Sequence, residues 1–210
     1  MRKAARVAAV ALVICFIALL AYGLASKGTS DRIDQALRDG RAVAAPSFDL
    51  ELLQTGELPP RLARRLRPAL ADGRLSLAEL RGTPVVFNMW ASWCTSCRSE
   101  ANPLENAWNT VGRRGMLFLG LDIQDLRSDA HEFLKEFDVT YPSVRESDRA
   151  VADSYGATGI PETFFIDGEG DVVGHVIGAV SAKQLAAGVA AAVSGRVAGV
   201  GSGGQRSKTR

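Results

Sequence analysis

Two cysteines spaced three residues apart, Cys94 and Cys97, constrain this chain more than any other feature. They follow a short apolar run, residues 84–89, and open a stretch, 97–112, whose pattern predicts a helix. At the first turn of a helix, unpaired backbone N–H groups and the helix dipole favour a thiolate. The pair therefore predicts a redox-active dithiol, with an exposed Cys94 that attacks a substrate disulfide and a shielded Cys97 that resolves the mixed disulfide.

Other uses of a Cys-x-x-Cys pair fit this chain less well. Zinc needs about four ligands, and the pair is accompanied only by His131 and His175, both expected at the surface. We therefore expect no metal and no other cofactor. Arg98 stands where covalent haem attachment would need histidine. A purely structural disulfide stays open, although a bridge over so short a loop constrains little of the unfolded chain.

An uncharged run, residues 7–26, follows Arg2, Lys3 and Arg6 at the N-terminus. At about 1.5 Å per residue the run spans a bilayer core of roughly 30 Å. Residues 1–26 therefore predict a single transmembrane helix whose basic flank stays in the cytoplasm, which places the rest of the chain outside it. The sequence Gly-Leu-Ala at residues 23–25 is a tolerable small-residue cleavage site, so a cleaved signal peptide, and hence secretion, is the alternative.

Charge and composition divide the rest of the chain. Seven of the basic residues lie at the two ends, so residues 7–195 carry −5 of an overall +2. A mildly acidic domain excludes the basic face of a nucleic-acid-binding protein. We predict a linker at 27–45, a domain at 46–194 and a disordered Gly/Ser-rich tail at 195–210. Residues from about 55 to 71 form a basic insertion, which is either a solvated excursion or a patch for anionic lipid or a partner.

The order of the expected elements indicates an α/β sheet. Strands are predicted at 46–52, 84–89, 116–122, 163–167 and 172–177. Helices are predicted at 97–112, 128–137, 148–155 and 181–193, with Ser128 and Ser181 as N-caps and Leu62 and Leu66 on one face of a short helix in the insertion. Strand, helix, strand, helix and then a hairpin implies a mixed sheet whose first strands are parallel.

Three motifs, taken together, carry a resemblance to a known family. They are DGRLSLAELRG at residues 72–82, WASWCTSCRSE at 90–100 and GIPETFFID at 159–167. As a set they resemble the TlpA/ResA/CcmG(DsbE) branch of the thioredoxin-fold oxidoreductases, over about Pro46 to Val193. The resemblance implies a thioredoxin fold, with a central mixed β-sheet flanked by helices and an N-terminal β extension. Members of this branch are membrane-anchored extracytoplasmic thiol-disulfide reductases, and many serve cytochrome c maturation.

The resemblance also implies where a substrate binds. Pro161 is expected to be cis and to pack against a redox disulfide between Cys94 and Cys97. Because proline has no N–H, it cannot compete for the hydrogen bonds of an incoming peptide strand. Trp93, Ile160 and Pro161 are the expected substrate-binding residues.

Two carboxylates are further catalytic candidates. Glu100 lies one turn after Cys97 on the same helical face, and Glu162 follows the proline. In the family, acidic residues at these positions tune the cysteines and move protons, and a desolvated glutamate can have a pKa high enough to accept the proton of Cys97. The alternative for each is a surface carboxylate without a catalytic role. Asn88 stands where cytosolic thioredoxins have a buried aspartate, so that proton relay is absent.

The leading hypothesis is a monomeric protein-disulfide reductase that keeps apocytochrome c cysteines reduced and receives electrons from a membrane thiol-disulfide transporter. A disulfide-forming oxidase is a second hypothesis, which the acidic neighbours disfavour because they oppose the thiolate. A non-enzymatic copper-site assembly factor is a third, because two thiolates are soft ligands. Neither histidine lies in a recognised copper motif.

Overall fold

The computed structural model describes residues 13–17 and 32–207 of the chain. Its strands are β1 (Val43–Ala44), β2 (Asp49–Gln54), β3 (Arg74–Ser76), β4 (Val85–Trp90), β5 (Leu117–Ile123), β6 (Ser143–Glu146), β7 (Glu162–Ile166), β8 (Asp171–Ile177) and β9 (Gly199–Ser202). Its helices are α2 (Arg32–Arg38), α3 (Pro60–Leu66), α4 (Thr95–Val111), α5 (Arg127–Glu136), α6 (Ala150–Ser154) and α7 (Ala182–Ser194), with short 3₁₀ turns η2 (Leu77–Leu80) and η3 (Gly112–Arg114).

The strands form one mixed sheet in the order β1-β8-β7-β4-β5-β6-β2-β3, and β9 also pairs with β8. Strands β4, β5 and β6 are parallel, whereas β7 and β8 form an antiparallel hairpin next to β4. Every residue of β4 and β5 is buried, as expected for central strands that are covered on both faces. The predicted mixed sheet with parallel first strands is confirmed, and β1 to β3 supply the N-terminal β extension.

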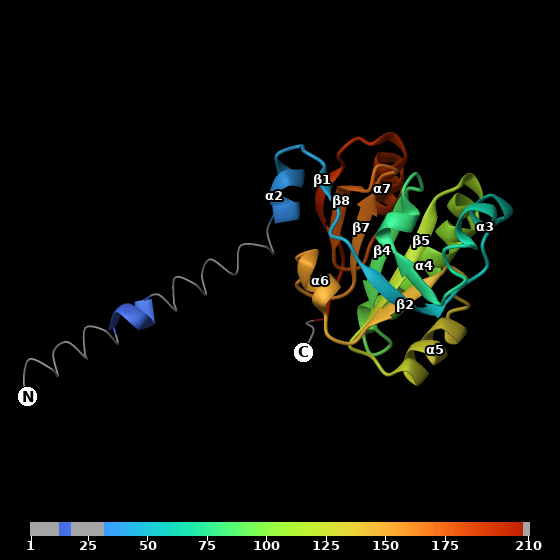
Figure 1. Cartoon of the computed structure of the whole chain (residues 1–210), viewed down its shortest axis with the longest axis horizontal. Helices are drawn as coiled ribbons and strands as arrows, with labels where there is room; N and C mark the ends of the chain where they lie inside the picture. Colours follow the sequence, from blue (N-terminus) through green and yellow to red (C-terminus); the bar gives the residue numbers. More distant parts are fainter. Residues whose placement is uncertain (1–12, 18–31, 208–210) are drawn as a thin grey trace, which may run out of the picture.

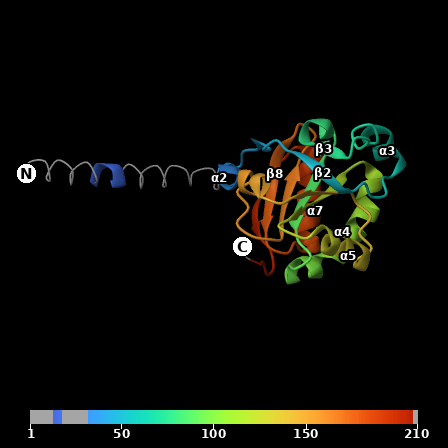
Figure 2. The same cartoon turned by 60° about the horizontal axis from the view of Figure 1, so that its bottom comes forward.

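Helices cover both faces of the sheet (Figure 1). On one face, Asn88 of β4 contacts α4, and Trp90 stacks on Phe133 of α5. Helix α7 packs on the same face, where Gly188 meets the ring of Phe165. Phe87 points to the opposite face, because side chains alternate along a strand, and its ring contacts Tyr155 next to α6. Figures 1 and 2 both place α2 beside β8 and α3 at the other end of the sheet.

The basic insertion folds around a short helix, as predicted. Leu62 and Leu66 of α3 are buried, and Arg61 and Arg65 lie on its exposed side. These arginines line a cleft of about 1090 Å³ between α3, α4 and α7. None of the predicted site residues lines this cleft.

The ends of the domain differ from the sequence prediction. The described part of the predicted linker folds into α2 and β1, and α2 buries Ile33 and Leu37. The predicted disordered tail is wrong for residues 199–202, which form β9 along β8. Val197, just before β9, and Val200, within it, pack against the core, and apolar contact of that kind is what a disordered segment lacks.

Two further predictions concern helix ends and the N-terminus. Helix α7 is capped by Ser181 as predicted, but α5 begins after Leu126, so Ser128 is not its N-cap. Among the described residues, no helix is both long and apolar enough to cross a bilayer. Apart from residues 13–17, the predicted anchor at 1–26 lies outside the described residues.

Candidate active site

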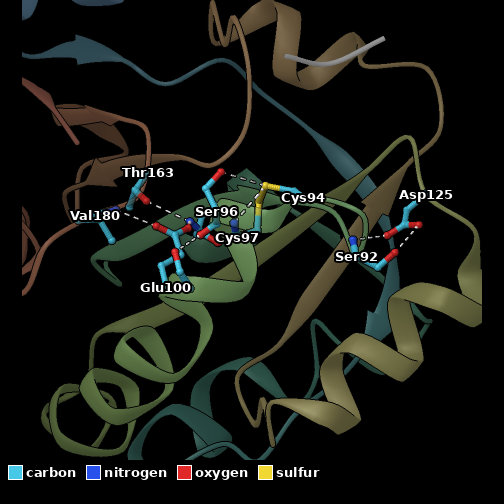
Figure 3. The surroundings of a disulfide bond; sticks show 10 residues. Ser92, Cys94, Ser96, Cys97, Glu100, Asp125, Thr163 and Val180 are labelled. Atoms are coloured by element: carbon cyan, nitrogen blue, oxygen red, sulfur yellow. Dashed lines mark hydrogen bonds between the residues drawn. A yellow bond between two sulfur atoms is a disulfide. The ribbon is translucent and has the colours of Figure 1, made fainter. Parts of the chain in front are cut away.

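The two cysteines form a disulfide at the start of α4 (Figure 3). Cys94 is the N-cap of the helix, and its Sγ accepts the N–H of Cys97 at 3.1 Å. The backbone N–H of Cys97 in the first turn therefore points at the sulfur that would carry the thiolate charge. The predicted exposure of Cys94 is wrong: the side chains of Cys94 and Cys97 are 0% and 1% exposed. A substrate disulfide cannot reach Sγ of Cys94 unless part of the surrounding chain moves.

Glu100 lies one turn further along α4 and is buried, so the surface alternative for this residue is wrong. Its Oε1 accepts from Asn88 Nδ2 at 2.8 Å, and its Oε2 accepts from the N–H of Val180 at 2.7 Å. Burial raises the pKa of Glu100 to about 7, although both hydrogen bonds oppose the shift. The carboxyl can therefore take up and release a proton near neutral pH.

Glu162 is also buried, but the structure does not bring it to Glu100. Thr163 pairs with Asn88 and faces α4, so its neighbour Glu162 points to the opposite face of the sheet. There its Oε1 accepts the N–H groups of Thr158 and Gly159, both at 3.0 Å. These contacts hold the loop before Pro161. A role for Glu162 in proton transfer stays a prediction.

His175 completes this second buried cluster, and its predicted surface position is wrong. The side chain is 2% exposed; Nε2 lies 3.0 Å from Glu162 Oε2, and Nδ1 lies 2.7 Å from Asp34 Oδ1 of α2. Burial alone would lower the pKa of His175, but the hydrogen bonds and charges of Asp34 and Glu162 outweigh burial and raise it. The sequence signal was a histidine inside an apolar strand, Val172 to Ile177.

The expected substrate-binding residues lie on two loops, Trp93 directly before Cys94 and Ile160 and Pro161 directly before β7. The packing of Pro161 against the disulfide stays a prediction. The Ile160–Pro161 bond is cis, as the resemblance implies, and both residues are buried. Trp93 is 41% exposed, and its Nε1 donates to the carbonyl of Gln124 at 3.1 Å. The indole therefore presents a fixed apolar surface next to Cys94. Substrate binding by these three residues stays a prediction.

The sequence analysis missed two carboxylates, Asp122 in β5 and Asp125 on the loop after it, and Asp125 holds the chain before Cys94. Asp125 accepts from the N–H and the hydroxyl of Ser92 (Figure 3). Behind it, Asp122 is fully buried, and burial and the charge of Asp125 raise its pKa to about 8 against the opposing effect of Arg145. Within residues 13–17 and 32–207, no group of three or more His, Cys, Asp or Glu side chains could hold a metal ion.

The sheet, the Cys94–Cys97 disulfide at the start of a helix and the cis-proline directly before β7 define a thioredoxin-fold thiol-disulfide oxidoreductase. Residues 43–175 match the AhpC/TSA family. The chain belongs to this family.

Curated relatives and solved structures agree with this class. The chain is 36% identical to the thiol:disulfide interchange protein DsbE of Pseudomonas fluorescens biotype C, over 56% of this chain and 68% of the relative. It is 32% identical to the thiol-disulfide oxidoreductase ResA of Bacillus subtilis, over 48% of this chain and 56% of the relative. A thioredoxin-family thiol:disulfide interchange protein from Chlorobium tepidum superposes with a TM-score of 0.57 at 27% identity, covering 73% of this chain and 98% of the other. MTB dsbF superposes with a TM-score of 0.56 at 25% identity, covering 70% and 95%.

Proposed function

We propose that this protein is an extracytoplasmic reductase of protein disulfides, with apocytochrome c cysteines as its client in cytochrome c biogenesis. The observation that supports electron transfer from the dithiol to the client is the buried Glu100, whose pKa of about 7 leaves much of it ionised at neutral pH. A negative charge one turn from the dithiol disfavours a stable thiolate. Because a strong oxidant owes its potential to a stabilised reduced form, this environment favours a reductant.

The reaction consumes the reduced dithiol. The Cys94 thiolate attacks one sulfur of the client disulfide, and the client's other sulfur leaves as a thiolate, which takes a proton from water. Ionised Glu100 accepts the Cys97 proton, directly or through a water molecule, and the Cys97 sulfur attacks Sγ of Cys94. The second client sulfur leaves as a thiolate and takes up the proton that Glu100 had accepted. The client has then gained two electrons and two protons, and the Cys94–Cys97 disulfide remains. A membrane thiol-disulfide transporter then supplies two electrons to restore the dithiol.

Location and anchoring complete the proposal. The uncharged run at residues 7–26 and its basic flank support a single-pass anchor with the domain outside the cytoplasm, and a cleaved signal peptide would give a secreted protein instead. The protein acts as a monomer. The copper-site alternative is weakened by His175, since both of its ring nitrogens are already hydrogen-bonded to carboxylates.

The reduction potential of the Cys94–Cys97 couple tests this proposal. We expect the full chain, equilibrated in defined redox buffers, to have a potential near the roughly −270 mV of thioredoxin. A value near −120 mV, typical of a strong periplasmic oxidant, would make disulfide formation the function instead. Cys94→Ala should abolish the reduction of insulin by the protein. Cells that lack the protein should accumulate apocytochrome c.

A further inference from the structure

The last described residues, 203–207, return to the loop that carries the cis-proline. After β9, the N–H of Gly204 donates to Ala179, and the N–H of Ala179 donates to Gln205. Ser207 then forms an antiparallel bridge with Ile160. The N–H of Ile160 donates to the Ser207 carbonyl at 3.0 Å, and the N–H of Ser207 donates to the Ile160 carbonyl at 2.6 Å. Both backbone groups of Ile160 are therefore occupied by the chain's own tail.

Side-chain contacts fix the tail at this position. Nη1 of Arg206 donates to Thr158 Oγ1 at 2.6 Å and lies 3.7 Å from Glu162 Oε1. The approach is close at Gly159, where an added Cβ would lie 2.9 Å from the Ser207 carbonyl oxygen. The tail is therefore held by its backbone pairing with Ile160 and by the contacts of Arg206. Gly159 on the loop, which has no Cβ, lets the tail approach.

The same groups are those that an extended client peptide would use. A peptide that adds to a backbone edge takes its affinity from main-chain N–H and C=O groups. Ile160 is the residue directly before Pro161, which has no N–H to offer. A client segment and the tail therefore cannot pair with Ile160 at the same time.

We propose that residues 203–207 are an internal competitor of the client, occupying the peptide position at Ile160 until a client segment displaces them. This inference rests on the proposed function. It also defines the client segment, which is an extended strand with a basic residue next to the residue that pairs with Ile160. That basic residue would contact Thr158 and Glu162, as Arg206 does here.

The sharpest variant removes one backbone donor of the tail. Ser207→Pro removes the N–H that donates to Ile160, whereas Ser207→Ala keeps it. With dithiothreitol as the electron source, we expect S207P in the full chain to raise kcat/KM for insulin by about threefold to tenfold, the effect of losing one hydrogen bond. The change should lie in KM, because freeing the tail raises the fraction of molecules able to bind a client. S207A should stay at the wild-type value.

A small aromatic disulfide, 5,5′-dithiobis(2-nitrobenzoic acid), has no peptide backbone and serves as the second substrate. Its rate should be the same in wild type, S207P and S207A. Arg206→Gln should also raise kcat/KM for insulin, whereas Arg196→Gln, an exposed arginine before β9, should not. A synthetic peptide of residues 203–210 should inhibit S207P in competition with insulin, and a scrambled peptide should not.

The outcomes separate the two proposals. If S207P and S207A reduce insulin equally, the tail is not a competitor. An equal gain on both substrates would mean that the tail is a general cover over the cysteines, which also overturns the proposal. If no form of the protein reduces either disulfide through Cys94, the proposed function itself is wrong and the competitor proposal falls with it.

Discussion

Glu100 combines burial, two hydrogen bonds and a position one turn after Cys97. If its carboxylate accepts the Cys97 proton, the release step should quicken as pH rises through about 7, the pKa of this carboxyl. Glu100→Gln should remove that pH dependence and lower kcat about a hundredfold, the lower end for a general base. Attack by Cys94, measured as mixed-disulfide formation in a Cys97→Ala background, should change little. Glu132→Gln, which replaces an exposed carboxylate on α5, is the control. If the rate of the release step in E100Q still changes near pH 7, Glu100 is not the base that accepts the Cys97 proton.

The same variant has a stability signature. The folded-state pKa of Glu100 is raised from 4.5 to about 7, so between these values the folded protein binds more protons than the unfolded chain. Its stability therefore falls as pH rises across this range. E100Q lacks this titrating group. The difference in the free energy of unfolding between E100Q and wild type should therefore rise by about 3 kcal/mol in favour of E100Q from pH 4.5 to pH 7. Denaturant melts at several pH values measure the difference.

At the residue scale, local spacing predicts what one helix positions and misses what distant segments bring together. Cys94, Cys97 and Glu100 lie on consecutive turns of α4, so their proximity follows from sequence. The contacts of Glu162 depend on which face of β7 it occupies. That face is set by the pairing of β7 with β4, in which Glu162 lies opposite Met89, 73 residues earlier in the chain. His175 pairs with Asp34, 141 residues away. No local pattern contains that contact.

Helix α2 is joined to the sheet through a buried charge cluster. His175 lies between Asp34 and Glu162, which in turn contacts Arg206, while Arg38 lies 3.3 Å from Asp34. The raised pKa of His175 means that the protonated form is favoured in the folded state. Its contribution to stability is therefore fully present below about pH 6.5 and is lost as pH rises through the folded-state pKa.

His175→Gln tests this cluster. The variant should lower the free energy of unfolding by about 3 kcal/mol at pH 6, as when one member of a buried ion pair is removed, and by less at pH 9. His131→Gln replaces the exposed histidine of α5 and should stay within about 0.5 kcal/mol of wild type. Thermal melts at the two pH values give the comparison. An equal loss at pH 6 and pH 9 would show that the protonated imidazole does not bind the cluster.

Elements with a strong intrinsic pattern were predictable, and those held by tertiary contact were not. Buried strands β4 and β5 are continuous apolar runs, and α7 begins at a serine that caps it. Strand β9, by contrast, has the sequence GVGS, which resembles a flexible tail. It is ordered because β8 offers it an unpaired edge, and an edge of that kind is a property of the assembled sheet.

At the scale of the whole molecule, the two redox states should differ in stability in a way that reports the direction of electron transfer. In a closed thermodynamic cycle, the difference in the free energy of unfolding between oxidised and reduced protein is proportional, through nF for two electrons, to the difference in reduction potential between the folded and unfolded dithiol. Under the proposed function, ionised Glu100 opposes a thiolate at the start of α4, and the disulfide restricts the unfolded chain, which raises the free energy of the unfolded state by about 2 kcal/mol for a loop this short. Both effects favour the oxidised state.

We therefore expect the oxidised protein to unfold at a higher denaturant concentration than the protein reduced with dithiothreitol. Denaturant melts of the full chain with and without the reductant measure this, and a Cys94→Ser, Cys97→Ser double variant, which keeps Cys15, should unfold at the same concentration in both conditions. A strong oxidant shows the reverse order, because its reduced form is the more stable one. If the reduced protein is the more stable state, folding energy drives oxidation of the client, and the chain forms disulfides instead of reducing them.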